Sequence, residues 1–87
     1  MAKVEIYTTG SCGYCVAAKM LLKSRGFGYD EIRVDTDPAR LKEMLSRAQK
    51  RTVPQIFIDD RHIGGYEELA AAAAAGTLVA APPGDAA

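Results

Sequence analysis

The chain has 87 residues, with eleven basic and eleven acidic side chains and a formal net charge of zero. A chain of this length forms a single domain, near the small end of those that fold without disulfides or metals. The balanced charge provides no overall attraction to nucleic acid or to an anionic membrane, so we expect neither as a partner. No apolar run approaches the roughly 20 residues of a membrane span, and no leader precedes the first predicted strand. We therefore expect a soluble, cytoplasmic protein.

Strand and helix patterns alternate through the first half of the chain. Residues 3–8 and 29–34 predict two strands. Between them, residues 16–25 carry apolar side chains on one helical face and lysines on the other, which predicts a helix. Residues 37–48 begin with an aspartate N-cap followed by proline and then repeat apolar residues at helical spacing, which predicts a second helix.

The second half of the chain predicts a hairpin and a covering helix. Residues 55–58 and 61–63 form two short apolar runs joined by a pair of aspartates, which is typical of a hairpin. A third helix is expected from residue 66 until Gly76 ends it.

The resulting order is βαβ followed by ββα, which predicts an α/β fold. A right-handed helical crossover joins the parallel pair, and the hairpin completes a four-stranded mixed sheet flanked by three helices. We expect the domain to span residues 1–79. Residues 80–87 contain prolines and glycine and little to bury, so we expect a disordered tail there.

Cys12 and Cys15 are the only cysteines and lie three apart, where the first strand gives way to the first helix. Helix N-terminal amides and the helix dipole stabilise a thiolate at Cys12, and a thiolate is the nucleophile in disulfide exchange. Zinc needs four ligands, and His62, the one histidine, reads better as a satisfied sheet residue. A structural disulfide would close only a very short loop. The spacing therefore favours a redox-active dithiol, in the position of a thioredoxin-like active site.

Two further segments suggest a ligand site. Pro54, at the start of a strand, allows a cis bond after Val53 that would expose backbone for an extended peptide ligand. Taken alone, Pro54 is better explained as a simple strand-entry proline. Gly64 and Gly65 precede the third helix, whose first amides could bind a carboxylate while the adjoining glutamates meet an amine. The alternative is an ordinary loop into a helix whose acidic first turn complements the dipole.

Residues 4–78 together resemble the glutaredoxins, the glutathione-dependent branch of the thioredoxin-like superfamily, most clearly over residues 52–65. The resemblance implies a glutathione-dependent thiol-disulfide oxidoreductase that reduces protein–glutathione mixed disulfides and protein disulfides, with Cys12 as nucleophile and Cys15 as resolving thiol. Glutathione reductase would act indirectly. The glutathione-binding residues that the resemblance implies, with a cis Val53-Pro54 bond, are Tyr14, Thr52, Val53, Pro54, Gly65, Tyr66 and Glu67. Lys50 or Arg51 could meet the glycyl carboxylate, or either could be plain surface charge.

The chain departs from the family pattern at several positions. Gly13 replaces the more common proline, Thr9 stands where a basic residue is frequent, and Glu67 replaces an aspartate. An alanine run, residues 70–75, buries little apolar area in the last helix.

Gly13 makes a different function, the binding of an iron–sulfur cluster, an alternative. Some glutaredoxins with a small residue there assemble a [2Fe-2S] cluster between two protomers, which would use Cys12 and bound glutathione from each. Otherwise we expect a monomer without metal. A third alternative is a glutaredoxin-like protein that thioredoxin reductase reduces without glutathione.

Overall fold

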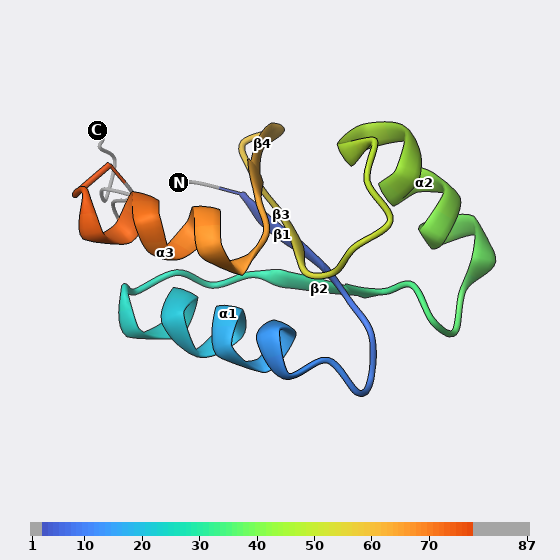
Figure 1. The fold of residues 1–87 in the computed structure, drawn as a ribbon, viewed down its shortest axis with the longest axis horizontal. Helices are drawn as coiled ribbons and strands as arrows, with labels where there is room; N and C mark the ends of the chain where they lie inside the picture. The colour runs from blue at the N-terminus through green and yellow to red at the C-terminus, as the bar shows by residue number, and fades with distance from the viewer. Residues whose placement is uncertain (1–2, 78–87) are drawn as a thin grey trace.

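The strands form one mixed sheet in the order β2-β1-β3-β4, with β1 parallel to β2 and antiparallel to β3, and β3 antiparallel to β4 (Figure 1). The structure, a computed structural model, describes residues 3–77. The elements in chain order are β1 (Val4–Thr8), α1 (Gly13–Ser24), β2 (Asp30–Arg33), α2 (Pro38–Ala48), β3 (Gln55–Ile58), β4 (Arg61–Gly64) and α3 (Tyr66–Ala74). The predicted βαβ-ββα order and the mixed sheet are confirmed, and the fold is thioredoxin-like.

The helices cover the two faces of the sheet unequally. Helices α1 and α3 lie side by side on one face, and α2 lies on the other (Figure 1). Strand residues alternate between the faces, so Ile6 and Ile56 pack with Leu22 of α1 and Leu69 of α3. The opposite face forms a second cluster that contains Tyr7, Val34, Met44, Ala48 and Phe57. The central strands, β1 and β3, therefore contribute side chains to both hydrophobic clusters.

Local chemistry explains the element boundaries. The Asp37 carboxylate caps α2 by accepting from the amide of Ala39 at 3.1 Å, and Pro38 occupies the first helical position. Asp59 and Asp60, with φ of 52° and 67°, form the left-handed turn that suits a two-residue hairpin. Helix α1 begins at Gly13, three residues before the predicted start, because Cys12 acts as its N-cap. The predicted tail, residues 80–87, lies outside the described residues.

A matched pair of α1 substitutions tests this packing. Leu22 is 0% exposed in the core, whereas Met20 is 66% exposed on the same helix. Leu22→Ala should lower the free energy of unfolding by about 2–5 kcal/mol because it leaves a cavity, and Met20→Ala should lower it by less than about 0.5 kcal/mol. Urea denaturation followed by circular dichroism measures both. Equal losses for the two variants would contradict the assigned faces of α1.

Candidate active site

Cys12 is the residue from which α1 starts. Its backbone is extended, with φ −94° and ψ 110°, and its Sγ accepts a hydrogen bond from the amide of Cys15 at 3.1 Å. The thiol also lies 3.7 Å from the carbonyl oxygen of Val53, to which it donates. The side chain is partly exposed. The expected position of Cys12 at a helix N-terminus is confirmed, and a sulfur anion there would have an amide donor and the helix dipole beside it.

Cys15 has the opposite environment. It is 1% exposed and belongs to the inner face of α1, and the two cysteines are not bridged. Burial, with the neighbouring Cys12, raises the pKa of the Cys15 thiol to about 12, although the Thr9 backbone and the Lys19 ammonium act in the opposite direction. The two thiols of the motif are therefore inequivalent, with one accessible and one held as the protonated thiol at neutral pH.

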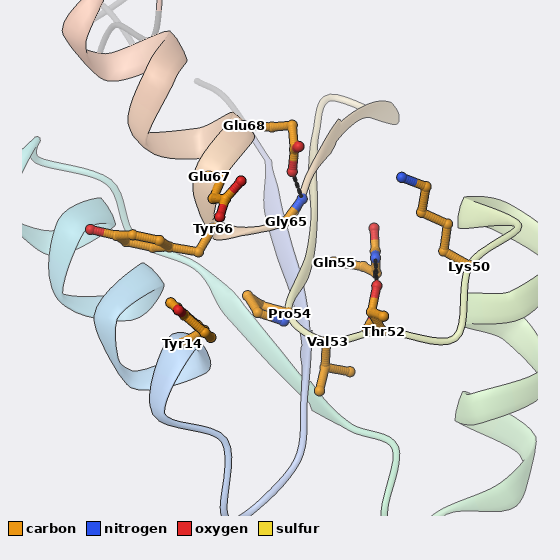
Figure 2. A pocket seen from close by; sticks show the side chains of 10 residues that line it. All are labelled: Tyr14, Lys50, Thr52, Val53, Pro54, Gln55, Gly65, Tyr66, Glu67 and Glu68. Carbon is orange, nitrogen blue, oxygen red and sulfur yellow. Dashed lines mark hydrogen bonds between the residues drawn. The ribbon is translucent and has the colours of Figure 1, made fainter.

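A cavity of about 440 Å³ opens beside the motif. It lies where the start of α1, the loop between α2 and β3, and the start of α3 meet (Figure 2). Its lining residues are Tyr14, Lys50, Thr52, Val53, Pro54, Gln55, Gly65, Tyr66, Glu67 and Glu68. Every ligand residue suggested from the sequence lines this cavity except Arg51, and the fold brings together segments that lie far apart in the chain.

The loop before β3 forms the floor of the cavity. The Val53-Pro54 peptide bond is cis, as the resemblance to the glutaredoxins implied. Thr52 and Val53 precede the first residue of β3, so strand pairing does not use their backbone groups. The contact between Cys12 and the Val53 carbonyl brings the thiol to this same backbone. An extended ligand paired with residues 52–53 would therefore place its own atoms next to Cys12.

The start of α3 forms one end of the cavity. Gly65 is the N-cap, and its amide donates to the Glu68 carboxylate at 2.7 Å, so the expected acidic first turn also supplies a cap. The next amides, those of Tyr66 and Glu67, have no acceptor inside the helix and can meet an anion. Gly64 has a φ of 121°, and a Cβ there would lie 2.8 Å from the Glu68 Cγ, so only glycine fits.

Aromatic and charged groups complete the walls. The rings of Tyr14 and Tyr66 lie 5.9 Å apart and form an apolar side of the cavity. Glu67 lies at the α3 end, while Lys50 approaches from the side of α2 (Figure 2). The cavity thus has a helix N-terminus at one end and an ammonium group toward the other.

Sequence reasoning missed one lining residue, Gln55, and it included Glu68 among the glutamates for an amine without recognising its capping role. That role could have been found from the position of Glu68 three residues after the N-cap, which is the capping-box spacing. Gln55 is a polar residue in a strand whose four positions are all buried, a signal that could have marked it for a specific hydrogen-bonding role. Among residues 3–77, no group of three or more histidine, cysteine or acidic side chains could hold a metal ion. Within the same residues, no helix has the length and apolar character needed to cross a membrane.

A dithiol at the N-terminus of α1 in a thioredoxin-like fold defines a thiol-disulfide oxidoreductase. The glutaredoxin family model matches residues 4–63, and the chain belongs to the glutaredoxin family. Glutaredoxin 3 of Escherichia coli is 50% identical over 78 residues, which cover 90% of this chain and 94% of that relative.

Solved structures agree with the assignment. The solution structure of a glutaredoxin from Brucella melitensis has a TM-score of 0.77 and 40% identity, covering 88% of this chain and 84% of that one. The crystal structure of a buckwheat glutaredoxin–glutathione complex has a TM-score of 0.80 and 30% identity, covering 88% and 73% of the two chains.

The inequivalence of the thiols predicts selective alkylation. In the reduced protein near neutral pH, iodoacetamide should label Cys12 and leave Cys15 unlabelled, because Cys15 is buried and its pKa is raised to about 12. Mass spectrometry of tryptic peptides measures the labelling. The Cys12→Ser variant should remain almost unlabelled until urea unfolds it. Equal labelling rates for the two cysteines in the folded wild type would contradict the assigned environments.

Proposed function

We propose that this protein reduces protein–glutathione mixed disulfides and protein disulfides at the expense of glutathione. The observation that carries the proposal is the cavity beside Cys12. It offers a helix N-terminus at one end, an ammonium group toward the other and backbone free of strand pairing on its floor, which suit the two carboxylates and the central peptide of a γ-glutamyl tripeptide. The buckwheat structure of similar fold, a complex with glutathione, supports it. We place the protein in the cytoplasm, a compartment that keeps thiols reduced and supplies glutathione.

Glutathione would bind across the cavity in a single orientation, with its γ-glutamyl end at α3 and its glycyl end at Lys50. Its γ-glutamyl carboxylate would meet the free amides at the start of α3, and its amine would meet the Glu67 carboxylate. Its cysteine backbone would pair with Thr52 and Val53, which brings its sulfur toward Cys12. Its glycyl carboxylate would meet the Lys50 ammonium. Arg51 lies outside the cavity lining, so Lys50 is the better candidate of the two.

Reduction of a glutathionylated protein then takes two exchange steps. The Cys12 thiolate attacks the glutathionyl sulfur, the mixed disulfide breaks, and the substrate sulfur leaves and takes up a proton. A Cys12–glutathione disulfide remains. A second glutathione thiolate attacks the glutathionyl sulfur of that disulfide, which releases oxidised glutathione and restores the Cys12 thiolate. Glutathione reductase would recycle the oxidised glutathione.

Cys15 enters only when the substrate is a protein disulfide. It would lose its proton and attack the Cys12 sulfur of the enzyme–substrate disulfide, which releases the substrate thiolate and leaves a Cys12–Cys15 disulfide for glutathione to reduce. Because the pKa of Cys15 is raised to about 12, little thiolate is present at neutral pH. The one-cysteine route should therefore dominate whenever the substrate carries glutathione.

Two serine variants test these roles. Cys12→Ser should abolish deglutathionylation of a model peptide, because no accessible thiolate remains. Cys15→Ser should retain at least about half of this activity and lose reduction of a peptide disulfide that needs intramolecular resolution. The glutathione reductase-coupled assay, followed by NADPH oxidation, measures both substrates. Full activity in the Cys12 variant would refute the assignment.

The same assay shows whether glutathione or thioredoxin reductase reduces the protein. Omitting glutathione should stop turnover, because the second exchange step uses its thiol. If thioredoxin reductase and NADPH sustain full turnover without glutathione, the third alternative holds and the cavity does not serve glutathione. The presence of both the α3 end and the Thr52-Val53 floor argues against that outcome.

Cluster binding remains a second candidate because of the surface above Gly13. A Cβ at Gly13 would meet no atom within 4 Å, so there is open space beside this position, and the Cys12 thiol suits iron–sulfur chemistry. Among residues 3–77, one chain offers no cluster of three or more metal-binding side chains. A second protomer and two glutathione thiols would therefore be needed to complete a ligand set.

Anaerobic reconstitution with iron, sulfide and glutathione tests this candidate. If it holds, the protein should become coloured, with visible absorbance, and should elute as a dimer. Gly13→Pro is the matched control, because proline suits the first helical position and should keep the fold while it prevents cluster assembly. A colourless monomer from the wild type would remove cluster binding from the functions of this protein.

A further inference from the structure

Gln55 is the buried polar residue of the cavity, and its side chain is 1% exposed. It lies on the α2 face of the sheet, two residues before Phe57. A buried amide is normally hydrogen-bonded on both its nitrogen and its oxygen, since unmade hydrogen bonds are costly there. Its partners, Thr52 on one side and His62 on the other, therefore define a chain of hydrogen bonds.

One carbonyl determines the direction of that chain. Gln55 Nε2 lies 2.9 Å from the main-chain oxygen of Thr52 and 3.1 Å from its hydroxyl Oγ1 (Figure 2). A carbonyl oxygen can only accept, so the Gln55 atoms facing it must be the N–H group. The Gln55 oxygen then faces His62 Nε2 at 2.6 Å. Because this oxygen also only accepts, His62 Nε2 carries the hydrogen and donates it.

The direction has a consequence for the hydroxyl of Thr52. A hydroxyl group has a single hydrogen to donate, and the Thr52 oxygen already accepts from Gln55, so that hydrogen is left for another acceptor. Thr52 is exposed and lines the cavity on the side of Lys50, away from the start of α3 (Figure 2). An acceptor at this place would meet a hydroxyl donor and an ammonium together, which suits a carboxylate.

We propose that His62 and Gln55 are positioning residues that orient the Thr52 hydroxyl to donate, with Lys50, to the glycyl carboxylate of glutathione. This inference rests on the proposed function, since it names the contact that distinguishes one end of the ligand. It also gives a role to His62, the residue that the sequence predicted to be a satisfied sheet histidine.

Stacking holds His62 in place although it lies on the exposed strand β4. Its ring is stacked on Phe57 with centroids 4.8 Å apart and planes 27° apart. The Arg47 guanidinium covers the Phe57 ring as well, with its carbon 4.0 Å from the centroid. A ring fixed in this way presents Nε2 to Gln55 in one orientation, so an exposed residue supports the direction that the Thr52 carbonyl sets.

Variants that break the chain at different links test the inference. Gln55→Glu keeps the shape, and in its ionised form it has no hydrogen to donate, so the Thr52 hydroxyl would donate to the new carboxylate instead. His62→Phe keeps a ring on Phe57 but removes the donor, and Thr52→Val removes the hydroxyl itself. Each variant is assayed with a glutathionylated peptide and with the same peptide carrying glutathione esterified at its glycyl carboxylate.

The ratio of the two KM values is the measurement. The wild type should prefer the free carboxylate by roughly tenfold, the scale of a hydrogen bond to a charged group. Gln55→Glu and Thr52→Val should reduce the ratio several-fold, to the preference that Lys50 alone provides, and His62→Phe should reduce it by a smaller factor. The loss should appear as a higher KM for the peptide with the free carboxylate, because the ester has already lost the charge that the hydroxyl meets. Arg61→Gln, an exposed neighbour on β4, should keep the wild-type ratio.

The possible outcomes distinguish failure of this inference from failure of the proposed function. If Gln55→Glu and His62→Phe keep the wild-type ratio, or raise both KM values equally, the two residues are merely structural and the inference is overturned while the proposed function stands. If the wild type shows no saturable turnover of either glutathionylated peptide, the proposed function fails and the inference falls with it. Thermal melting checks that each variant is folded. Should Gln55→Glu unfold, His62→Phe carries the test, because it changes an exposed residue.

Discussion

The site depends on the register between the central strands of the sheet. Tyr7, near the end of β1, pairs with Gln55, the first residue of β3, and Ile56 pairs with Gly64 at the end of β4. These pairings bring the C-terminal end of β1, the start of β3 and the C-terminal end of β4 together at one end of the sheet. Cys12 follows β1, the Val53-Pro54 loop precedes β3, and α3 follows β4, so the three segments lie at this end. A slip of one residue in β3 would turn Gln55 and Phe57 to the opposite face and separate the thiol from its floor.

The two faces of the sheet support the site in different ways. The face under α1 and α3 is apolar, and its packing fixes the helix that carries both cysteines. The α2 face contains a polar network, in which the buried Tyr7 hydroxyl donates to Glu43 and accepts from Arg47. Burial and the Glu43 carboxylate raise the pKa of Tyr7, so its hydroxyl keeps the hydrogen that it donates.

Arg47 links this network to the cavity. Its guanidinium also pairs with Glu5 at 3.0 Å and covers the Phe57 ring on which His62 stacks. The same residue thus ties β1 to β3 and supports the histidine next to Gln55. Gln55 and His62 already have defined hydrogen-bond and stacking contacts. Their side chains are therefore held before any ligand arrives, which lowers the entropic cost of ordering them on binding.

Burial creates the asymmetry of the dithiol. Cys12 and Cys15 are separated by only two residues, yet a helical turn places one at the cap of α1 and the other on its inner face. The Cys12 sulfur has an amide donor and access to solvent, which suits the nucleophilic role that we propose for it. The Cys15 sulfur is buried, and burial opposes its ionisation.

The sequence by itself determined the order of the elements, the hairpin turn, the α2 cap and the position of the dithiol at a strand–helix junction, because these features are encoded by residues near one another in the chain. It also suggested most of the cavity lining, through a resemblance carried by residues 52–65. Only the tertiary structure decided that Lys50 lines the cavity and Arg51 does not, that Cys15 is buried, and that Thr52, Gln55 and His62 form one directed chain. Those features depend on how separate strands pair and which face each side chain takes, and local propensity does not contain that information.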